Sequence, residues 1–184
     1  MKSLTKLGRA LRTIHFYKWA FGDLTASDSD IGMAAEYLVG EILGCLPPGR
    51  KVKAPFDLIT KSGVNLEVKS TSKPYACKGR SPYYRWDIST QTAAIRGERP
   101  LADVWIFLIA KFPSSSVDIL DYRYWRCYLA TASQARTFTV KQYLAESALK
   151  RLNLASFPLS DLKHKFDSLS TLDLLPRPLS PLNS

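Results

Sequence analysis

The sequence has few cysteines, no long apolar run and no acidic residue among its first 22 positions. Its three cysteines, Cys45, Cys77 and Cys127, are widely spaced and match no zinc or iron–sulfur pattern, which favours a reducing compartment. The longest apolar stretch is too short and too well bounded to span a bilayer. We therefore expect an intracellular protein, cytoplasmic or associated with the nucleoid, with no membrane partner.

Length and composition indicate one globular domain. The chain has 184 residues, of which 46% are hydrophobic and 23% are charged, and this is ordinary for a globular protein with a substantial core. The net charge of +10 favours a polyanionic partner, although the same charge would suit a ribosomal or anionic-membrane-binding protein. We expect a basic extension at residues 1–28, the domain at 29–169 and a flexible tail at 170–184, where Leu, Pro and Ser dominate.

The acid-free segment at residues 1–22 has apolar residues at helical spacing. It carries five basic residues: Lys2, Lys6, Arg9, Arg12 and Lys18. Such a segment could be a basic helix that contacts DNA or a second copy of the chain, or an organellar transit peptide. The aromatic residues Trp19 and Phe21 are typical of packed positions and favour the first interpretation.

Two short segments at residues 51–59 and 64–71 predict a β-hairpin. Both are rich in β-branched and aliphatic residues, and a turn containing Ser62 and Gly63 joins them. A three-residue loop that ends in glycine is typical of a hairpin in which Gly63 takes the left-handed position of a G1 bulge.

The register of this hairpin gathers three charged residues. If the loop is centred on Ser62, Asp57 lies directly opposite Glu67, and Lys69 falls on the same face, two residues along the strand. The alternate positions then point into the core: Leu58, Leu66 and Val68.

Facing carboxylates require a positive charge between them, because like charges directly opposite destabilise a sheet. Asp57 and Glu67 offer the oxygen ligands that Mg²⁺ prefers, with Mn²⁺ as a second candidate and the Val68 carbonyl as a further ligand. Lys69 could position a water or stabilise charge that develops on a phosphate. The alternative is an ion-pair ladder on an exposed hairpin face.

The string Pro55-Phe56-Asp57 followed by Glu67-Val68-Lys69 resembles the motif of the PD-(D/E)XK nuclease superfamily, with Phe56 inserted between the proline and the aspartate. The order of expected elements is similar over about residues 30–130. The resemblance implies an α/β domain with a restriction-endonuclease-like core, in which a mixed central β-sheet is flanked by helices in the order αβββαβ. It also implies a Mg²⁺-dependent deoxyribonuclease, with an endonuclease of the restriction, homing or junction-resolving type favoured. Many relatives are dimers, so a homodimer or higher homo-oligomer is an expected assembly.

An apolar helix is expected before the hairpin. Ser29 or Asp30 can cap it, and Gly44 can end it. Glu36 lies at the edge of its apolar arc, where it would face the hairpin. The resemblance assigns Glu36 to the metal site, directly or through water, with Glu41 as the second candidate. Either glutamate could instead only solvate the edge of the helix.

The segment downstream of the hairpin predicts the rest of the sheet. The apolar run at residues 102–112 predicts a central strand buried on both faces, and residues 124–131 predict another strand. Residues 90–97 could form the crossover helix that a parallel connection requires. Gln91 falls where some relatives place an active-site glutamine, although it could be an ordinary polar residue at a helix start. Two further helices are expected, at residues 142–154 and 158–169.

A basic, aromatic segment at residues 72–99 is the expected nucleic-acid contact. Basic residues neutralise phosphates, and aromatic side chains stack on bases or wedge a groove. We assign nucleic-acid binding to four of its basic residues: Lys73, Lys78, Arg80 and Arg85. The alternative is a solvated loop that its aromatic residues hold down. The sequence thus predicts a Mg²⁺-dependent DNA nuclease, and the competing hypothesis is a catalytically inactive DNA- or RNA-binding protein of the same fold.

Overall fold

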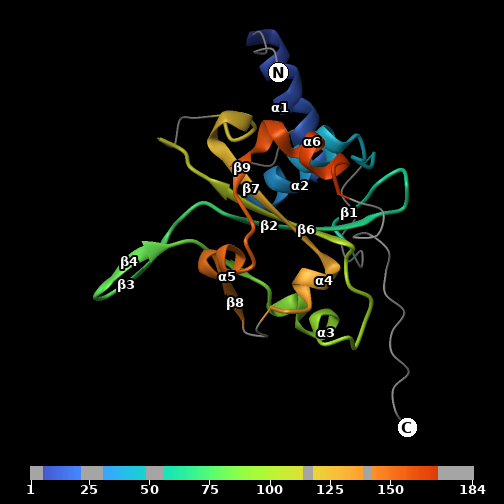
Figure 1. Cartoon of the computed structure of the whole chain (residues 1–184). Coiled ribbons are helices and arrows are strands. Elements are labelled where there is room, and N and C mark those ends of the chain that lie inside the picture. Colours follow the sequence, from blue (N-terminus) through green and yellow to red (C-terminus); the bar gives the residue numbers. More distant parts are fainter. Residues whose placement is uncertain (1–5, 22–30, 49–55, 114–117, 139–141, 170–184) are drawn as a thin grey trace.

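A mixed, five-stranded β-sheet forms the centre of the molecule (Figure 1). The computed structural model describes residues 6–21, 31–48, 56–113, 118–138 and 142–169. In spatial order the strands are β1 (Leu58–Ile59), β2 (Asn65–Thr71), β6 (Val104–Ala110), β7 (Trp125–Thr131) and β9 (Phe157–Pro158). Only the β2–β6 pair is parallel. The expected α/β class with a mixed central sheet is confirmed.

The parallel pair is joined by a crossover that contains a short helix. A 3₁₀ turn at Ser89–Gln91 leads into α3 (Thr92–Ile95), close to the expected residues 90–97. Every residue of β6 is buried, because helices or strands cover both faces of the sheet at this point. The apolar run therefore forms the central strand, as predicted.

Each face of the sheet packs against a different set of elements. One face carries Leu66, Val68 and Ile106, and it packs against α1 (Lys6–Phe21), α2 (Ile31–Leu43) and α6 (Leu162–Asp167). The other face carries Trp105 and Phe107. It packs against α3, α4 (Ala132–Ala135), α5 (Glu146–Arg151) and a two-stranded sheet of β5 (Arg85–Asp87) and β8 (Tyr143–Ala145). Strand alternation thus separates two hydrophobic cores, one on each face of the sheet.

The helix α1 packs into the core that α2 covers. Phe16 and Trp19 are buried, and their rings make edge contacts with Tyr37 of α2 at centroid distances of 5.3 and 5.7 Å. Part of the expected N-terminal extension therefore belongs to the core. Residues 22–30 and the expected tail at 170–184 lie outside the described residues.

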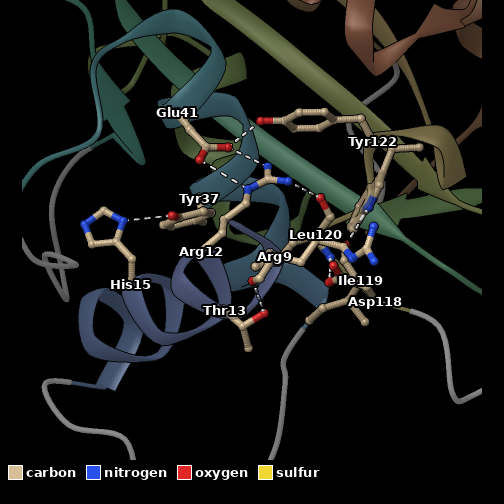
Figure 2. A network of polar contacts seen from close by, with 11 residues as sticks. Arg9, Arg12, Thr13, His15, Tyr37, Glu41, Asp118, Ile119, Leu120 and Tyr122 are labelled. Atoms are coloured by element: carbon tan, nitrogen blue, oxygen red, sulfur yellow. Dashed lines mark hydrogen bonds and ion pairs between the residues drawn. The ribbon is translucent and has the colours of Figure 1, made fainter. Parts of the chain in front are cut away.

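A polar network fixes α1 against α2 and a 3₁₀ turn at Tyr122–Tyr124 (Figure 2). Arg12 lies 2.5 Å from Glu41 Oε2 and donates a hydrogen bond of 2.7 Å to the Leu120 carbonyl. Its guanidinium also lies over the Tyr122 ring, and the Tyr122 hydroxyl donates to Glu41. Nearby, His15 Nδ1 lies 2.8 Å from the Tyr37 hydroxyl. The Glu41 carboxylate therefore contacts Arg12 of α1 and the Tyr122 hydroxyl. These contacts do not favour Glu41 as the second candidate for the metal site.

The β1–β2 hairpin has the predicted register at Leu58/Leu66 and Ile59/Asn65, but the ladder does not extend to the expected pair of Asp57 and Glu67, because the Asp57 N–H donates to the Leu66 carbonyl. Leu58 pairs with Leu66, and the Thr60 N–H donates to the Val64 carbonyl at 2.9 Å. Gly63 has a φ of +84°, the left-handed conformation that this loop requires. The strand is shorter than expected, since Phe56 and Asp57 form a bend before β1. Residues 51–55 of the expected strand lie outside the description.

The segment after β2 is not the solvated loop that was the alternative interpretation of the sequence. It forms a two-stranded antiparallel ribbon of β3 (Tyr75–Cys77) and β4 (Arg80–Tyr83), followed by β5. The first helix expected downstream is shorter than residues 142–154, because β8 precedes α5 and pairs with β5. The second begins with β9 and a 3₁₀ turn at Leu159–Asp161, so α6 covers only its later part.

The helix α2 matches the expected helix over Ile31–Leu43 and ends at Gly44, which has a φ of +67°. A Cβ at Gly40 would come within 2.9 Å of the Leu46 side chain. The absent side chain at Gly40 therefore admits the loop that follows α2. No helix within the described ranges is long and apolar enough to cross a membrane.

Candidate active site

Asp57 lies beside the edge of β2, one residue before β1 begins. Its backbone N–H donates to the Leu66 carbonyl at 3.1 Å, and its carboxylate Oδ2 accepts the Val68 N–H at 2.7 Å. The Asp57 side chain therefore accepts the β2 backbone hydrogen bond that a neighbouring strand would otherwise accept. The bend at residues 56–57 thus turns the carboxylate toward the exposed edge of the sheet, while Leu58 enters the core.

The pKa of Asp57 is raised from 3.8 to about 7. Burial is the largest cause, followed by the negative charges of Glu67 and Glu36, while the Val68 N–H and Lys69 oppose the shift. Glu36 is a buried residue of α2, 9% exposed, and its charge acts on Asp57 across the β1–β2 hairpin. Three carboxylates from α2, the bend before β1 and β2 thus influence one another.

Glu67 is almost fully enclosed, with 1% of its surface exposed. Its Oε1 lies 2.5 Å from Lys69 Nζ and accepts a hydrogen bond of 2.6 Å from the Gln91 side-chain amide. Trp105 of β6 is the cross-strand neighbour of Glu67, and this buried ring stands on the same face of the sheet. The Lys69 ammonium group, the Gln91 amide and the Trp105 ring therefore hold Glu67 in one orientation.

Arg99 extends this chain of contacts. Its Nη2 donates to Gln91 Oε1 at 3.0 Å and also to the Thr90 carbonyl. Because the amide oxygen of Gln91 accepts from Arg99, its NH₂ group is directed at Glu67. Sequence reasoning singled out Gln91 but missed Arg99, which lies in a polar loop without any motif. Nothing in the sequence marks Arg99 as a site residue except that it lies eight residues after Gln91.

The oxygen atoms at this edge suit a hard divalent cation. Asp57 and Glu67 supply two carboxylates. The Val68 carbonyl lies on the same side of β2 as the Val68 N–H that Asp57 accepts, since both groups of a strand residue point to one side. Mg²⁺ is typically held by one or two carboxylates and several waters. Over the described ranges no three His, Cys, Asp or Glu residues are grouped closely enough to hold a metal ion, so Glu36 is placed as an electrostatic neighbour and not as a third direct ligand.

The residues assigned to nucleic-acid binding lie after β2 and not at the carboxylates. Lys73 and Lys78 are exposed on the β3–β4 ribbon and its approach. Arg85 is half-buried, with its guanidinium 3.5 Å from the centroid of the Tyr75 ring and 3.9 Å from that of Tyr143. The side chain of Arg80 lies outside the description. Lys73 and Lys78 are therefore available to a ligand, whereas Arg85 holds two aromatic rings together.

The ribbon is connected to the carboxylates through β2 and β5. Ser72 follows the last residue of β2, and Lys69 is among the positive charges that act on Asp87 of β5. The pKa of Asp87 is lowered mainly by hydrogen bonds from Ser89, with Lys69 as a smaller cause. The ribbon therefore follows the end of the strand that carries Lys69.

No known protein family matches this chain, and no curated protein matches it either.

Proposed function

We propose that the protein is a Mg²⁺-dependent deoxyribonuclease of the PD-(D/E)XK type, with a restriction-endonuclease-like core. The observation that carries the proposal is the position of Asp57. Its buried carboxylate is fixed by the Val68 N–H beside Glu67 and Glu36, and its pKa is raised to about 7. Burial and two like charges oppose the ionisation of this carboxylate, and a bound divalent cation would offset both effects.

The order of elements supports the fold part of the proposal. The helix α2, the β1–β2 hairpin, the crossover helix α3 and the parallel strand β6 follow the order that the resemblance implies. In the part of the chain that the structure describes, five strands, β1 to β5, precede α3, whereas the resemblance implies three. Residues 49–55 lie outside the description.

In this proposal each residue has a separate task. Asp57 and Glu67 hold Mg²⁺ or Mn²⁺, together with the Val68 carbonyl. The bound ion supplies activation of water and neutralisation of the phosphate charge. Lys69 positions the attacking water and stabilises the negative charge of the pentavalent phosphate. Glu36 orders a water or accepts its proton. Gln91 keeps Glu67 oriented, and no side chain is needed as a nucleophile.

Cleavage assays test this proposal directly. Purified protein is incubated with plasmid, single-stranded and branched DNA, with Mg²⁺ and with EDTA. We expect Mg²⁺-dependent products with 5′-phosphate ends. Asp57→Asn, which keeps the acceptor for the Val68 N–H, and Lys69→Ala should each lower the rate by about 10²-fold or more. Lys165→Ala, an exposed lysine on α6, serves as the control and should cleave normally.

Two outcomes would refute the proposal. Cleavage that is unchanged in Asp57→Asn would remove the carboxylate from the mechanism. DNA binding without cleavage under Mg²⁺ or Mn²⁺ would favour the inactive DNA- or RNA-binding protein instead.

A further inference from the structure

The β3–β4 ribbon, residues Tyr75–Tyr83, is an isolated two-stranded sheet that projects from the body of the molecule (Figure 1). All three residues of β3 are exposed. Tyr75 pairs with Tyr83, Cys77 pairs with Arg80, and Gly79 closes the turn with a φ of +76°. A ribbon of this kind adds no residue to either core cluster. Its exposed strands therefore suit an intermolecular contact.

The charge of the ribbon is of one sign. Residues 72–86 contain no Asp or Glu and carry Lys73, Lys78, Arg80 and Arg85. The exposed side chains of Lys73 and Lys78 repel each other, and no acidic residue of this segment offsets their charge. A polyanion would offset this repulsion, and phosphate groups along a nucleic acid provide negative charge at a regular spacing.

The base of the ribbon is rigidly attached to the core. The Arg85 guanidinium lies between the Tyr75 and Tyr143 rings, and the Tyr75 ring makes an edge contact with Tyr83 at 5.6 Å. The next residue, Trp86, is fully buried, and its Nε1 donates to the Leu108 carbonyl at 2.9 Å. The direction of the ribbon is thus set by the same sheet that carries Glu67 and Lys69.

We propose that this ribbon enters the major groove of B-form duplex DNA. A major groove about 12 Å wide admits a two-stranded antiparallel ribbon, whereas the deep, narrow major groove of A-form RNA does not. Lys73 and Lys78 neutralise backbone phosphates at the sides of the groove. The ribbon follows the strand β2 that carries Lys69 and Glu67, after residues 72–74.

The aromatic side chains favour a duplex over a single strand. Proteins that bind single strands offer open aromatic faces on which bases stack. Here one face of Tyr75 and one face of Tyr143 are covered by Arg85, and the edge contact with Tyr83 further restricts Tyr75. These rings serve to anchor the ribbon. The inference rests on the proposed function in naming DNA as the substrate, and it adds that the substrate is base-paired.

Binding without catalysis tests the inference. Fluorescence anisotropy in EDTA compares a labelled DNA duplex with its single strand and with an RNA duplex of the same sequence. We expect the DNA duplex to bind most tightly. In the double variant Lys73→Ala/Lys78→Ala, the slope of log K against log salt concentration should fall by about 1.8, since each lost phosphate contact removes about 0.9. Lys165→Ala should retain the wild-type slope.

Cys77 supplies a second, direct measurement. It is an exposed thiol on β3, while Cys45 is half-buried and Cys127 is buried. The rate at which N-ethylmaleimide modifies Cys77, followed by peptide mass spectrometry, should fall several-fold when duplex DNA is added and stay unchanged with single-stranded DNA. Equal modification rates with and without the duplex would overturn the inference, as would a single strand or an RNA duplex that binds as tightly as duplex DNA.

The two proposals can fail separately. Protection of Cys77 by duplex DNA in a protein that cleaves nothing would uphold the ribbon contact and refute the nuclease. Mg²⁺-dependent cleavage with an unprotected ribbon and an unchanged salt slope in the double variant would uphold the nuclease and refute the ribbon contact.

Discussion

Gln91 donates its side-chain amide to Glu67 Oε1 at 2.6 Å, the same oxygen that Lys69 approaches to 2.5 Å. Because Gln91 and Lys69 both contact Oε1, they leave the other oxygen of Glu67, Oε2, to a different partner. The orientation of this carboxylate therefore depends on a residue from the crossover connection, outside the hairpin that carries Asp57 and Lys69.

Gln91→Ala should lower the affinity for Mg²⁺ more than it lowers the cleavage rate at saturating Mg²⁺. Loss of a partner that orients a ligand typically costs about 10- to 100-fold in metal affinity. We therefore expect the Mg²⁺ concentration for half-maximal cleavage to rise about tenfold, with a smaller change in the rate at saturating Mg²⁺. Initial rates over a Mg²⁺ series measure both quantities. Arg99→Ala should shift the same midpoint less, and a wild-type midpoint in Gln91→Ala would show that the contact does not orient Glu67.

The stability of the metal-free protein should fall as the pH rises from about 4 to about 7. The folded protein raises the pKa of Asp57 from 3.8 to about 7, so it retains a proton that the unfolded chain has released. This contribution is complete below pH 4 and is lost as the pH passes through 7. Its full size is on the order of 4 kcal/mol.

Urea denaturation in EDTA at pH 5 and pH 8 measures this loss. Asp57→Asn has no titrating carboxyl at this position, so its free energy of unfolding should change less between the two pH values than that of the wild type. Added Mg²⁺ should stabilise the wild type more at pH 8 than at pH 5, because the ion competes with the proton. Parallel pH profiles for the two proteins would contradict the raised pKa.

Arg12→Ala should destabilise the protein by about 1 to 3 kcal/mol. The substitution leaves Glu41 and the Leu120 carbonyl without the guanidinium, which is 9% exposed in the folded protein. The loss is limited because Glu41 is 34% exposed and can be hydrated. Chemical denaturation measures the effect, and the exposed Arg123 provides the control, since Arg123→Ala should leave the midpoint unchanged. Equal midpoints for both variants would show that the network of Figure 2 adds no stability.

Gly63→Ala should cost about 1 to 2 kcal/mol. A Cβ at Gly63 meets nothing within 4 Å, so the cost comes only from the left-handed backbone with its φ of +84°. Gly63→Asn should cost less, because asparagine tolerates this conformation. Thermal melting of the two variants compares them. An alanine variant as stable as the wild type would mean that the loop can adopt another turn.

The hairpin and the central strand could be predicted because their signals are local. Gly63 defines the loop, the loop defines the register, and the period of two then places Leu66 and Val68 in the core. The run that became β6 is apolar throughout, which is typical of a strand covered on both faces. The helix α2 combined an apolar face with a glycine stop at Gly44.

The β3–β4 ribbon and β8 could not be predicted because their determinants are not local. Gly79 and Pro82 favour a loop in the ribbon segment, and its strands are stabilised by pairing with each other and by the Arg85 contact with Tyr143. Tyr143–Ala145 has a helical pattern in the sequence, yet it pairs with β5, which lies far away along the chain. The contact of Arg99 with Gln91 likewise depends on how the crossover loop turns.

The position of Lys69 implies an exchange of counter-ions. In the protein without metal, its ammonium group is the cation that balances the enclosed Glu67. A divalent ion that bound Glu67 would take over this balancing role, and the ammonium group would then be free to turn toward a substrate phosphate. Binding of the ion and release of the lysine would be a single event, so the ammonium group would become available to a phosphate only after the ion had bound.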